Sequence, residues 1–174
     1  EFRRVLFRSH DIGGHMGGAT DPELFARWVQ FGALSPALRL HSTKDPRAER
    51  RPWKYPGDTY RAARAAFHLR YLMVPYLYTM ARVASDTSVS LCRPMYYEYP
   101  DQDAAYAARY QYFLGDQIIA APIVEPANTE TGMAATDVWL PEGEWIDYQT
   151  QEIFTGPRWV RLVGDMDRVP MLVR

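Results

Sequence analysis

The sequence has little cysteine, no long hydrophobic run and no excess of either charge, and each absence excludes a class of protein. The single cysteine, Cys92, cannot form a disulfide within the chain or a thiolate metal cage. No apolar run approaches the roughly 20 residues of a membrane-spanning helix, so we expect no membrane-embedded part. Because 21 acidic residues nearly balance 20 lysines and arginines, we expect no nucleic-acid partner, which normally requires a basic excess.

Aromatic residues, in contrast, are abundant. The 174 residues include 5 tryptophans, 12 tyrosines and 7 phenylalanines. Such side chains fill hydrophobic cores, and their flat faces also serve as platforms for the apolar faces of sugar rings. Composition alone leaves both uses open. The length suits one domain together with part of another.

The first eight residues fit their surroundings badly. In EFRRVLFR, arginines at positions 3, 4 and 8 interrupt the apolar residues without a helical or strand period, and no capping signal follows. We therefore expect residues 1–8 to be a cloning or sequencing-adapter remnant and not native protein. Sequencing the source DNA across this junction tests the expectation.

Residues 9–43 have the rhythm of an α/β unit. A glycine-rich loop precedes TDPELFARWVQFGAL, whose apolar residues recur at helical spacing and which Thr20 or Asp21 can cap. The run SPALRLHST then predicts a short strand whose end delivers His41. Loop, helix, strand and polar tip in this order predict part of an α/β domain.

A second helix is predicted over residues 59–84, after a long, charged and proline-rich connection. Pro75 falls inside this helix, and proline removes a backbone donor and crowds the preceding turn. We expect either one bent helix or two separate helices.

From residue 88 the pattern changes to short β-rich runs separated by proline, glycine, asparagine and aspartate. The segments PEGEW and FTGPRW resemble hairpin turns, which predicts antiparallel pairing and a small β-sandwich. We place the domain boundary here, with residues 9–87 forming one part and residues 88–174 the other.

The loop SHDIGGHMGG, residues 9–18, supports three interpretations. A metal site could use His10, Asp11 and His15 with the later His41, although the two close histidines lack the spacing of a helical zinc motif. A phosphate loop is disfavoured, because the lysine of a P-loop and the three-glycine spacing of a dinucleotide fingerprint are missing.

The third interpretation is the wall of a sugar pocket. A carboxylate accepts hydrogen bonds from adjacent sugar hydroxyls, and glycines let the backbone approach a ligand closely. In an α/β barrel, Asp11 and His41 would line the site at the carboxyl ends of neighbouring strands. The alternatives are a turn aspartate that bonds its own backbone, for Asp11, and an ordinary polar strand end, for His41.

Six segments resemble, in order, signatures of glycoside hydrolase family 31, the family of α-glucosidases and α-xylosidases. They are HDIGGH, DPELFARWVQFGALSPALRLHS, HLRYLMVPYLYT, CRPMYYEYP, YFLGDQIIAAPI and VWLPEGEWIDY, and the resemblance runs from about Ser9 to Arg174. It implies that residues 9–87 are the last two βα units of a TIM (β/α)8 barrel. Residues 88–174 would be the proximal carboxy-terminal β-sandwich.

The same resemblance implies roles for single residues. Asp11 and His41 resemble the family residues that bind the sugar in the −1 subsite. His10, His15 and Trp53 could contribute to the pocket wall. The resemblance implies structural roles for Arg27 and Trp28, and Arg27 would brace the barrel through a buried ion pair.

The resemblance implies a retaining α-glycosidase that uses no metal or organic cofactor and acts on an α-glycoside or oligosaccharide. Retaining glycosidases need two carboxyl groups about 5 Å apart, and in this family both precede the segment that this chain resembles. We therefore expect no catalytic residue in the chain and a dependence on the missing amino-terminal part. Alone, the chain should be inactive and poorly soluble. A noncatalytic carbohydrate-binding or structural module and a metal-dependent hydrolase are the alternatives.

Overall fold

The structure of the chain is a computed structural model that describes residues 10–16 and 18–174. The predicted leader, residues 1–8, lies outside the described residues. The chain divides into two compact units between Tyr76 and Leu77, and each is described by itself. Among the described residues, no helix combines the length and apolar character needed to cross a membrane.

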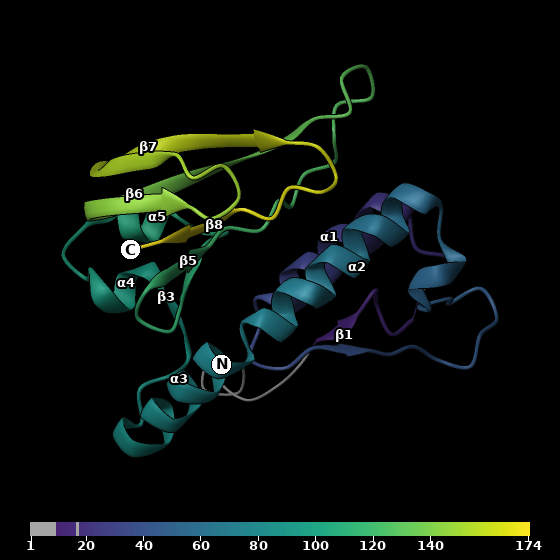
Figure 1. Cartoon of the computed structure of the whole chain (residues 1–174), viewed down its shortest axis with the longest axis horizontal. Coiled ribbons are helices and arrows are strands. Elements are labelled where there is room, and N and C mark those ends of the chain that lie inside the picture. Colours follow the sequence, from purple (N-terminus) through teal and green to yellow (C-terminus); the bar gives the residue numbers. More distant parts are fainter. Residues whose placement is uncertain (1–9, 17) are drawn as a thin grey trace. The chain divides into compact units, whose positions relative to one another are not determined.

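The first unit begins with a parallel βαβ arrangement (Figure 1). Strands β1 (Asp11–Ile12) and β2 (Arg39–Leu40) pair in parallel, and helix α1 (Pro22–Ala33) connects them. A short 3-10 helix, η2 (Pro52–Lys54), and helix α2 (Gly57–Leu72) follow. The predicted α/β organisation of this part is confirmed.

Helix α1 begins where its sequence predicts. The Asp21 side chain caps it by accepting a hydrogen bond from the backbone N–H of Leu24 at 3.0 Å. Gly32 lies inside the last turn, where a β-carbon would come within 2.9 Å of the Ile12 side chain. The missing side chain therefore lets the helix pack closely against β1.

Helices α1 and α2 enclose the core of the first unit and lie side by side in Figure 1. The buried residues of this core come from β1 and both helices: Ile12, Phe25, Val29, Ala33, Ala63 and Ala66. The guanidinium of Arg70 on α2 donates hydrogen bonds to the carbonyls of Ala33, Ser35 and Pro36. Ala33 is the last residue of α1, and its carbonyl is one that the helix end leaves without a helical partner, whereas Ser35 and Pro36 belong to the segment that follows.

The long second helix is two helices. Helix α2 ends at Leu72, and α3 (Val74–Thr87) begins after Met73. Pro75 is the second residue of α3. In the first turn of a helix the missing N–H of proline has no helical partner to lose, so the break places Pro75 where it is tolerated.

The second unit is a six-stranded sheet in which every pairing is antiparallel. Its strand order is β3-β4-β5-β8-β6-β7. The short elements are β3 (Cys92–Pro94), α4 (Met95–Glu98), α5 (Asp103–Ala107), β4 (Tyr112–Leu114), β5 (Ile118–Ala120) and β8 (Met171–Val173), and the long hairpin is β6 (Ala134–Asp147) with β7 (Ile153–Gly164). The predicted antiparallel organisation is confirmed, whereas the packing of two sheets as a sandwich stays a prediction.

The turn predictions for PEGEW and FTGPRW are wrong. Both segments lie inside the long strands β6 and β7, where Gly143 pairs with Gly156 across a register shift after Leu140. The observed turn comes at residues 148–152, because the Asp147 carboxylate accepts hydrogen bonds from the backbone N–H groups of Gln149 and Thr150. The prolines and glycines of these segments mark an irregularity within the strands.

Two buried groups organise the interior of the second unit. Trp145 is fully buried and donates its indole N–H to the carbonyl of Pro141 at 3.1 Å. Asp147 forms an ion pair with Arg168, and their side chains are only 1% and 8% exposed. Burial raises the pKa of Asp147, but the hydrogen bonds from Arg168 and the following turn hold it below its ordinary value.

Candidate functional site

The strand register places Asp11 beside an arginine. Asp11 on β1 is level with Arg39 on β2. The Arg39 Nη2 atom lies 2.7 Å from the Asp11 Oδ1 atom. The two side chains are 27% and 58% exposed, so the pair is accessible to a ligand.

Two histidines complete the cluster beyond the carboxyl ends of the strands. The His15 Nδ1 atom lies 3.2 Å from Asp11 Oδ2, so each carboxylate oxygen contacts one side chain. The rings of His15 and His41 stack with centroids 5.0 Å apart. The backbone N–H of Thr43 donates to the carbonyl of His15 at 2.9 Å, which ties the two loops together. Asp11, His15 and His41 thus form one cluster.

The surroundings of Asp11 favour its ionised form. The hydrogen bond from Arg39 lowers the pKa of Asp11 most, and the charges of Arg39, His41 and His15 add to this effect. Partial burial raises the pKa but does not reverse the shift. Asp11 is therefore an acceptor for hydrogen bonds at neutral pH and a poor proton donor.

The glycines of the loop serve its close packing. Gly13 and Gly14 have φ values of +90° and +87°, which side-chain-bearing residues rarely adopt. A β-carbon at Gly13 would also clash with the side chain of Arg50. Arg50 is buried and donates from Nε and Nη2 to the carbonyl of Gly14, at 3.1 and 2.8 Å. The Arg50 guanidinium thus fixes the loop between Asp11 and His15 through the Gly14 carbonyl.

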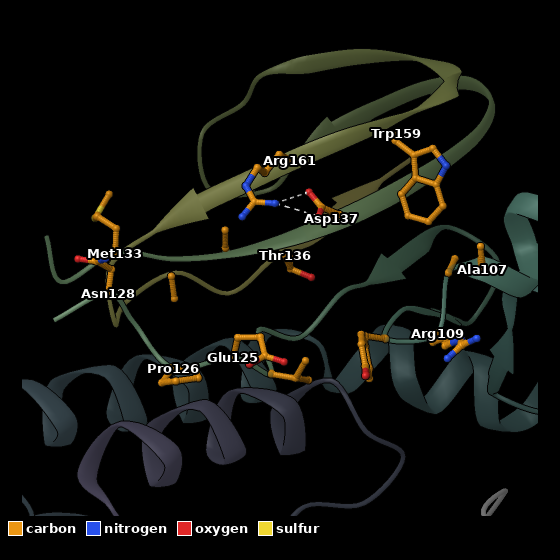
Figure 2. A pocket seen from close by; sticks show the side chains of 15 residues that line it. Ala107, Arg109, Glu125, Pro126, Asn128, Met133, Thr136, Asp137, Trp159 and Arg161 are labelled. Carbon is orange, nitrogen blue, oxygen red and sulfur yellow. Dashed lines mark hydrogen bonds and ion pairs between the residues drawn. The ribbon is translucent and has the colours of Figure 1, made fainter. Parts of the chain in front are cut away.

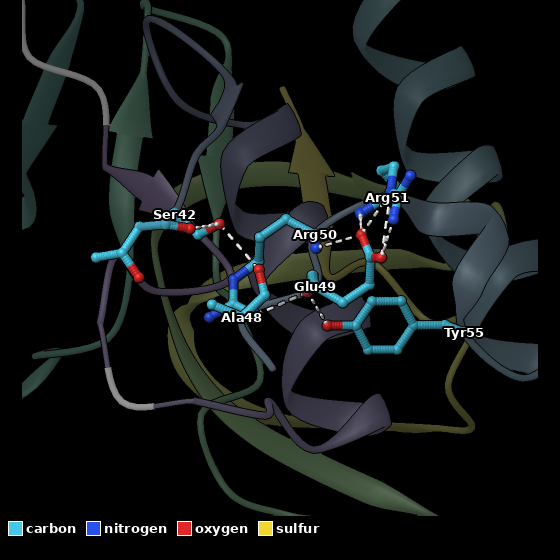
Figure 3. Close-up of polar contacts among 7 residues, drawn as sticks. Ser42, Ala48, Glu49, Arg50, Arg51 and Tyr55 are labelled. Atoms are coloured by element: carbon cyan, nitrogen blue, oxygen red, sulfur yellow. Dashed lines mark hydrogen bonds and ion pairs between the residues drawn. The ribbon is translucent and has the colours of Figure 1, made fainter. Parts of the chain in front are cut away.

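The segment that carries Arg50 is itself fixed by polar contacts, which Figure 3 shows. The Tyr55 hydroxyl donates to the carbonyl of Glu49 at 2.7 Å, and Ser42 donates to the carbonyl of Ala48 at 2.9 Å. Arg51 holds the Glu49 carboxylate and lowers its pKa to about 2. This long connection is consequently an ordered support for the cluster.

The other residues proposed from the sequence lie outside the cluster. His10 is exposed, and its ring lies 5.3 Å from that of Phe31. Trp53, on η2, is 66% exposed. Arg27 is buried on α1 and lies 3.3 Å from Glu23 on the same helix. Trp28 is half-buried against the core of the first unit and lies near Gly14.

Sequence reasoning missed Arg39 and Arg50. Arg39 could have been predicted, because it lies two residues before His41 in a predicted strand and its side chain therefore points to the same face of the sheet as that of His41. Arg50 had none, because it lies 36 positions from Gly14 in a charged connection with four other arginines and lysines in residues 44–54.

The cluster has the ingredients of a metal centre as well. Asp11, His15 and His41 offer one ligand atom each, and these atoms lie within 4.8 Å of one another. Imidazole and carboxylate are ligands for zinc and iron. However, Arg39 occupies one carboxylate oxygen, which would place a cation next to the metal.

Parallel strands joined by a helix, with polar side chains beyond their carboxyl ends, are the arrangement of an α/β-barrel site. The family profile of the glycosyl hydrolases family 31 TIM-barrel domain matches residues 3–80. The profile of the glycosyl hydrolase family 31 C-terminal domain matches residues 88–174. The chain belongs to glycosyl hydrolase family 31.

Characterised relatives include glucoside-processing enzymes. The chain is 32% identical to alpha-glucosidase 2 of Bacillus thermoamyloliquefaciens over 98% of its own length and 21% of the relative's. It is 35% identical to a 1,6-alpha-glucosyltransferase of Sporosarcina globispora over 87% of its own length and 12% of the relative's. The chain therefore spans about a fifth or less of these relatives.

Solved structures of the family are similar as well. A Flavobacterium johnsoniae dextranase complexed with isomaltotriose is 32% identical, with a TM-score of 0.87 over 98% of this chain and 21% of the dextranase. An alpha-xylosidase from a soil metagenome, complexed with xylose, is 30% identical, with a TM-score of 0.82 over 95% of this chain and 27% of the xylosidase.

Proposed function

We propose that this chain is the carboxy-terminal part of a retaining α-glycosidase. Residues 9–87 would be the last two βα units of its barrel, and residues 88–174 its proximal C-terminal β-sandwich. Three findings support this: the order of the two family profiles, the parallel pairing of β1 with β2, and the greater length of the relatives.

Within this enzyme, Asp11 and His41 would bind the sugar of the −1 subsite. The observation that carries this proposal is the Asp11 carboxylate, which Arg39 and His15 hold ionised and accessible beyond the parallel strands. A carboxylate that is already oriented can accept hydrogen bonds from two neighbouring sugar hydroxyls and loses little further conformational entropy on binding. His41, whose ring stacks on that of His15, would bind a hydroxyl of the same sugar.

The role of Asp11 would be positioning and not proton transfer. A general acid at neutral pH needs a raised pKa, whereas the Arg39 contact lowers the pKa of Asp11. The reaction would use two other carboxyl groups, a nucleophile and an acid/base about 5 Å apart. We propose that the part of the enzyme preceding this chain supplies both, and that no metal or organic cofactor takes part.

The partner of this chain would then be the preceding part of the same enzyme. Each unit exposes large apolar side chains: Tyr71 and Leu72 of the first unit are 78% and 72% exposed, and Tyr78 of the second unit is 79% exposed. Such surfaces promote association when they are left uncovered. The 174-residue chain alone is expected to be inactive on α-glycosides and to aggregate.

The test is kinetic and uses the longest natural protein that contains this sequence. Asp11→Ala and His41→Ala should each lower kcat/KM for an α-glucoside by about a hundredfold, the loss typical of a misplaced substrate. Asp58→Ala is the matched control, because Asp58 also pairs with an arginine but lies on the exposed surface of α2. Unchanged kcat/KM in the Asp11 variant rejects the assignment.

A metal-dependent hydrolase is the second candidate, favoured by the grouping of Asp11, His15 and His41. It predicts near-stoichiometric zinc or iron in the purified protein and loss of activity after chelation. The glycosidase proposal predicts that activity survives chelation. Metal analysis before and after dialysis against a chelator separates the two.

A further inference from the structure

The second unit contains a pocket that lies outside the candidate site. Its volume is about 600 Å³. One wall is the β6–β7 hairpin, and the other is formed by residues 107–110 and 124–128 (Figure 2). Every lining residue belongs to the second unit, so the pocket is a property of this unit alone.

One face of the hairpin brings an aromatic ring and a charged pair into this pocket. Trp159 and Arg161 lie two residues apart on β7, and therefore on the same face of the sheet. Asp137 lies directly opposite Arg161 on β6, and Arg161 Nη1 contacts both carboxylate oxygens at 3.0 and 2.9 Å. Figure 2 shows this pair on the hairpin wall of the pocket, between Met133 and Trp159.

These groups keep free hydrogen-bonding capacity. Within the part of the chain that the structure describes, the Trp159 indole N–H and the Nε and Nη2 atoms of Arg161 make no hydrogen bond. Trp159 is 46% exposed, although tryptophan is usually well buried. An accessible aromatic surface beside donors and a carboxylate is thus available to a ligand.

The charges indicate which ligand fits. Asp137 pairs with Arg161, and the opposite wall carries one charge of each sign, Glu125 and Arg109, so the lining has no net charge to attract phosphates or other anions. A neutral ligand with an apolar face and many hydroxyls matches both the indole and the paired charges. We propose that this pocket is a second, noncatalytic binding site for a neutral gluco-oligosaccharide chain.

This inference goes beyond the proposed function; the binding of a neutral sugar does not rest on that function, whereas the choice of a glucan does. A chain bound here would be held by the protein whether or not the Asp11 cluster binds sugar. In an enzyme that acts on a polymer, such a site raises the local concentration of the substrate. Loss of the site should therefore weaken binding of long glucans and leave the turnover of short glucosides unchanged.

Affinity electrophoresis tests the site without using activity. The longest natural protein containing this sequence is run on native gels with increasing dextran or soluble starch, and the retardation gives an apparent affinity. Trp159→Ala should weaken the retardation at least about tenfold, since truncation of an aromatic anchor typically costs this much. Arg161→Gln, a second exposed position, should weaken it as well.

Two controls separate this site from the rest of the molecule. Trp53→Ala removes another exposed tryptophan, 66% exposed and outside the pocket, and should leave the retardation unchanged. Asp58→Ala, at an exposed residue of α2 outside the pocket, should also leave it unchanged. Retardation that survives both Trp159→Ala and Arg161→Gln, or no retardation by either glucan, overturns the proposal.

Discussion

Each unit of the molecule contains an aspartate held by an arginine from another segment, and the two pairs differ in burial. Asp11 and Arg39 are 27% and 58% exposed, whereas Asp147 and Arg168 are 1% and 8% exposed. In both pairs the pKa of the aspartate lies below its ordinary value. The same type of ion pair therefore belongs to a candidate ligand site in the first unit and stabilises the interior of the second unit.

The comparison teaches that a lowered pKa alone does not identify a functional carboxylate. The remaining hydrogen-bonding capacity of Asp147 is used by the turn at Gln149 and Thr150. Among the described residues, the Asp11 carboxylate contacts the side chains of His15 and Arg39, and the Asp11 side chain is 27% exposed. Free acceptor capacity together with accessibility distinguishes the proposed substrate-binding group from the structural one.

The largest effect is expected where the buried pair is broken. Asp147→Ala leaves Arg168 buried without its carboxylate, and removal of one partner of a buried pair typically costs about 3–5 kcal/mol. Thermal and denaturant unfolding should show this loss in the second unit. Asp137→Ala is the control, because its pair with Arg161 is exposed and worth about 0–1 kcal/mol. Equal losses in the two variants would contradict the account.

A smaller effect is expected at the close contact in the first unit. Gly32→Ala adds a methyl group at 2.9 Å from the Ile12 side chain, and overpacking of this kind typically costs about 1–3 kcal/mol. The change should lower the free energy of unfolding measured with denaturant. Gly57→Ala is the control, because a β-carbon there meets no atom within 4 Å.

Loss of the exposed Asp11–Arg39 pair should change the pH dependence of activity. Arg39→Ala should lower kcat/KM of the complete protein about tenfold, the size of one charged hydrogen bond. Because Arg39 lowers the pKa of Asp11, its removal raises that pKa. The acidic limb of the pH profile should move to higher pH, and Arg39→Lys should restore part of the shift. A profile that keeps its acidic limb would contradict the role of Arg39.

The smallest effect is a pH dependence of stability in the second unit. The folded-state pKa of Asp147 is lowered from 3.8, so its contribution is fully present above about pH 4 and is lost as the pH falls through the folded value. Unfolding free energies measured between pH 5 and pH 3, about one unit to each side of the ordinary value, should decline. Asp147→Asn should show a shallower decline over the same range.

Much of the fold was predictable because it depends on local signals. The helical period and a capping residue at Thr20 or Asp21 predicted α1, and the β-rich runs after residue 88 predicted antiparallel strands. The hairpin turn was predicted wrongly, because glycine and proline mark both turns and strand irregularities. Only the side-chain contacts of Asp147 locate the real turn.

The sequence predicted Asp11 and His41 of the candidate site but not the arginine that contacts Asp11. Asp11 and His41 follow from polar residues at predicted strand ends, and the structure brings them together with His15. The contribution of Arg39 depends on the pairing register of two strands that are 28 positions apart. A sequence pattern does not contain this register, because it is set by packing against α1 and by the close approach at Gly32.

The most direct test of the central claim is a crystal structure of the longest natural protein containing this sequence, grown with glucose. The account predicts a sugar whose hydroxyls lie within hydrogen-bond distance of the Asp11 carboxylate and the His41 ring, with Arg39 still paired to Asp11. A metal ion bound to Asp11, His15 and His41, or a sugar that occupies the barrel without touching Asp11 and His41, would contradict it.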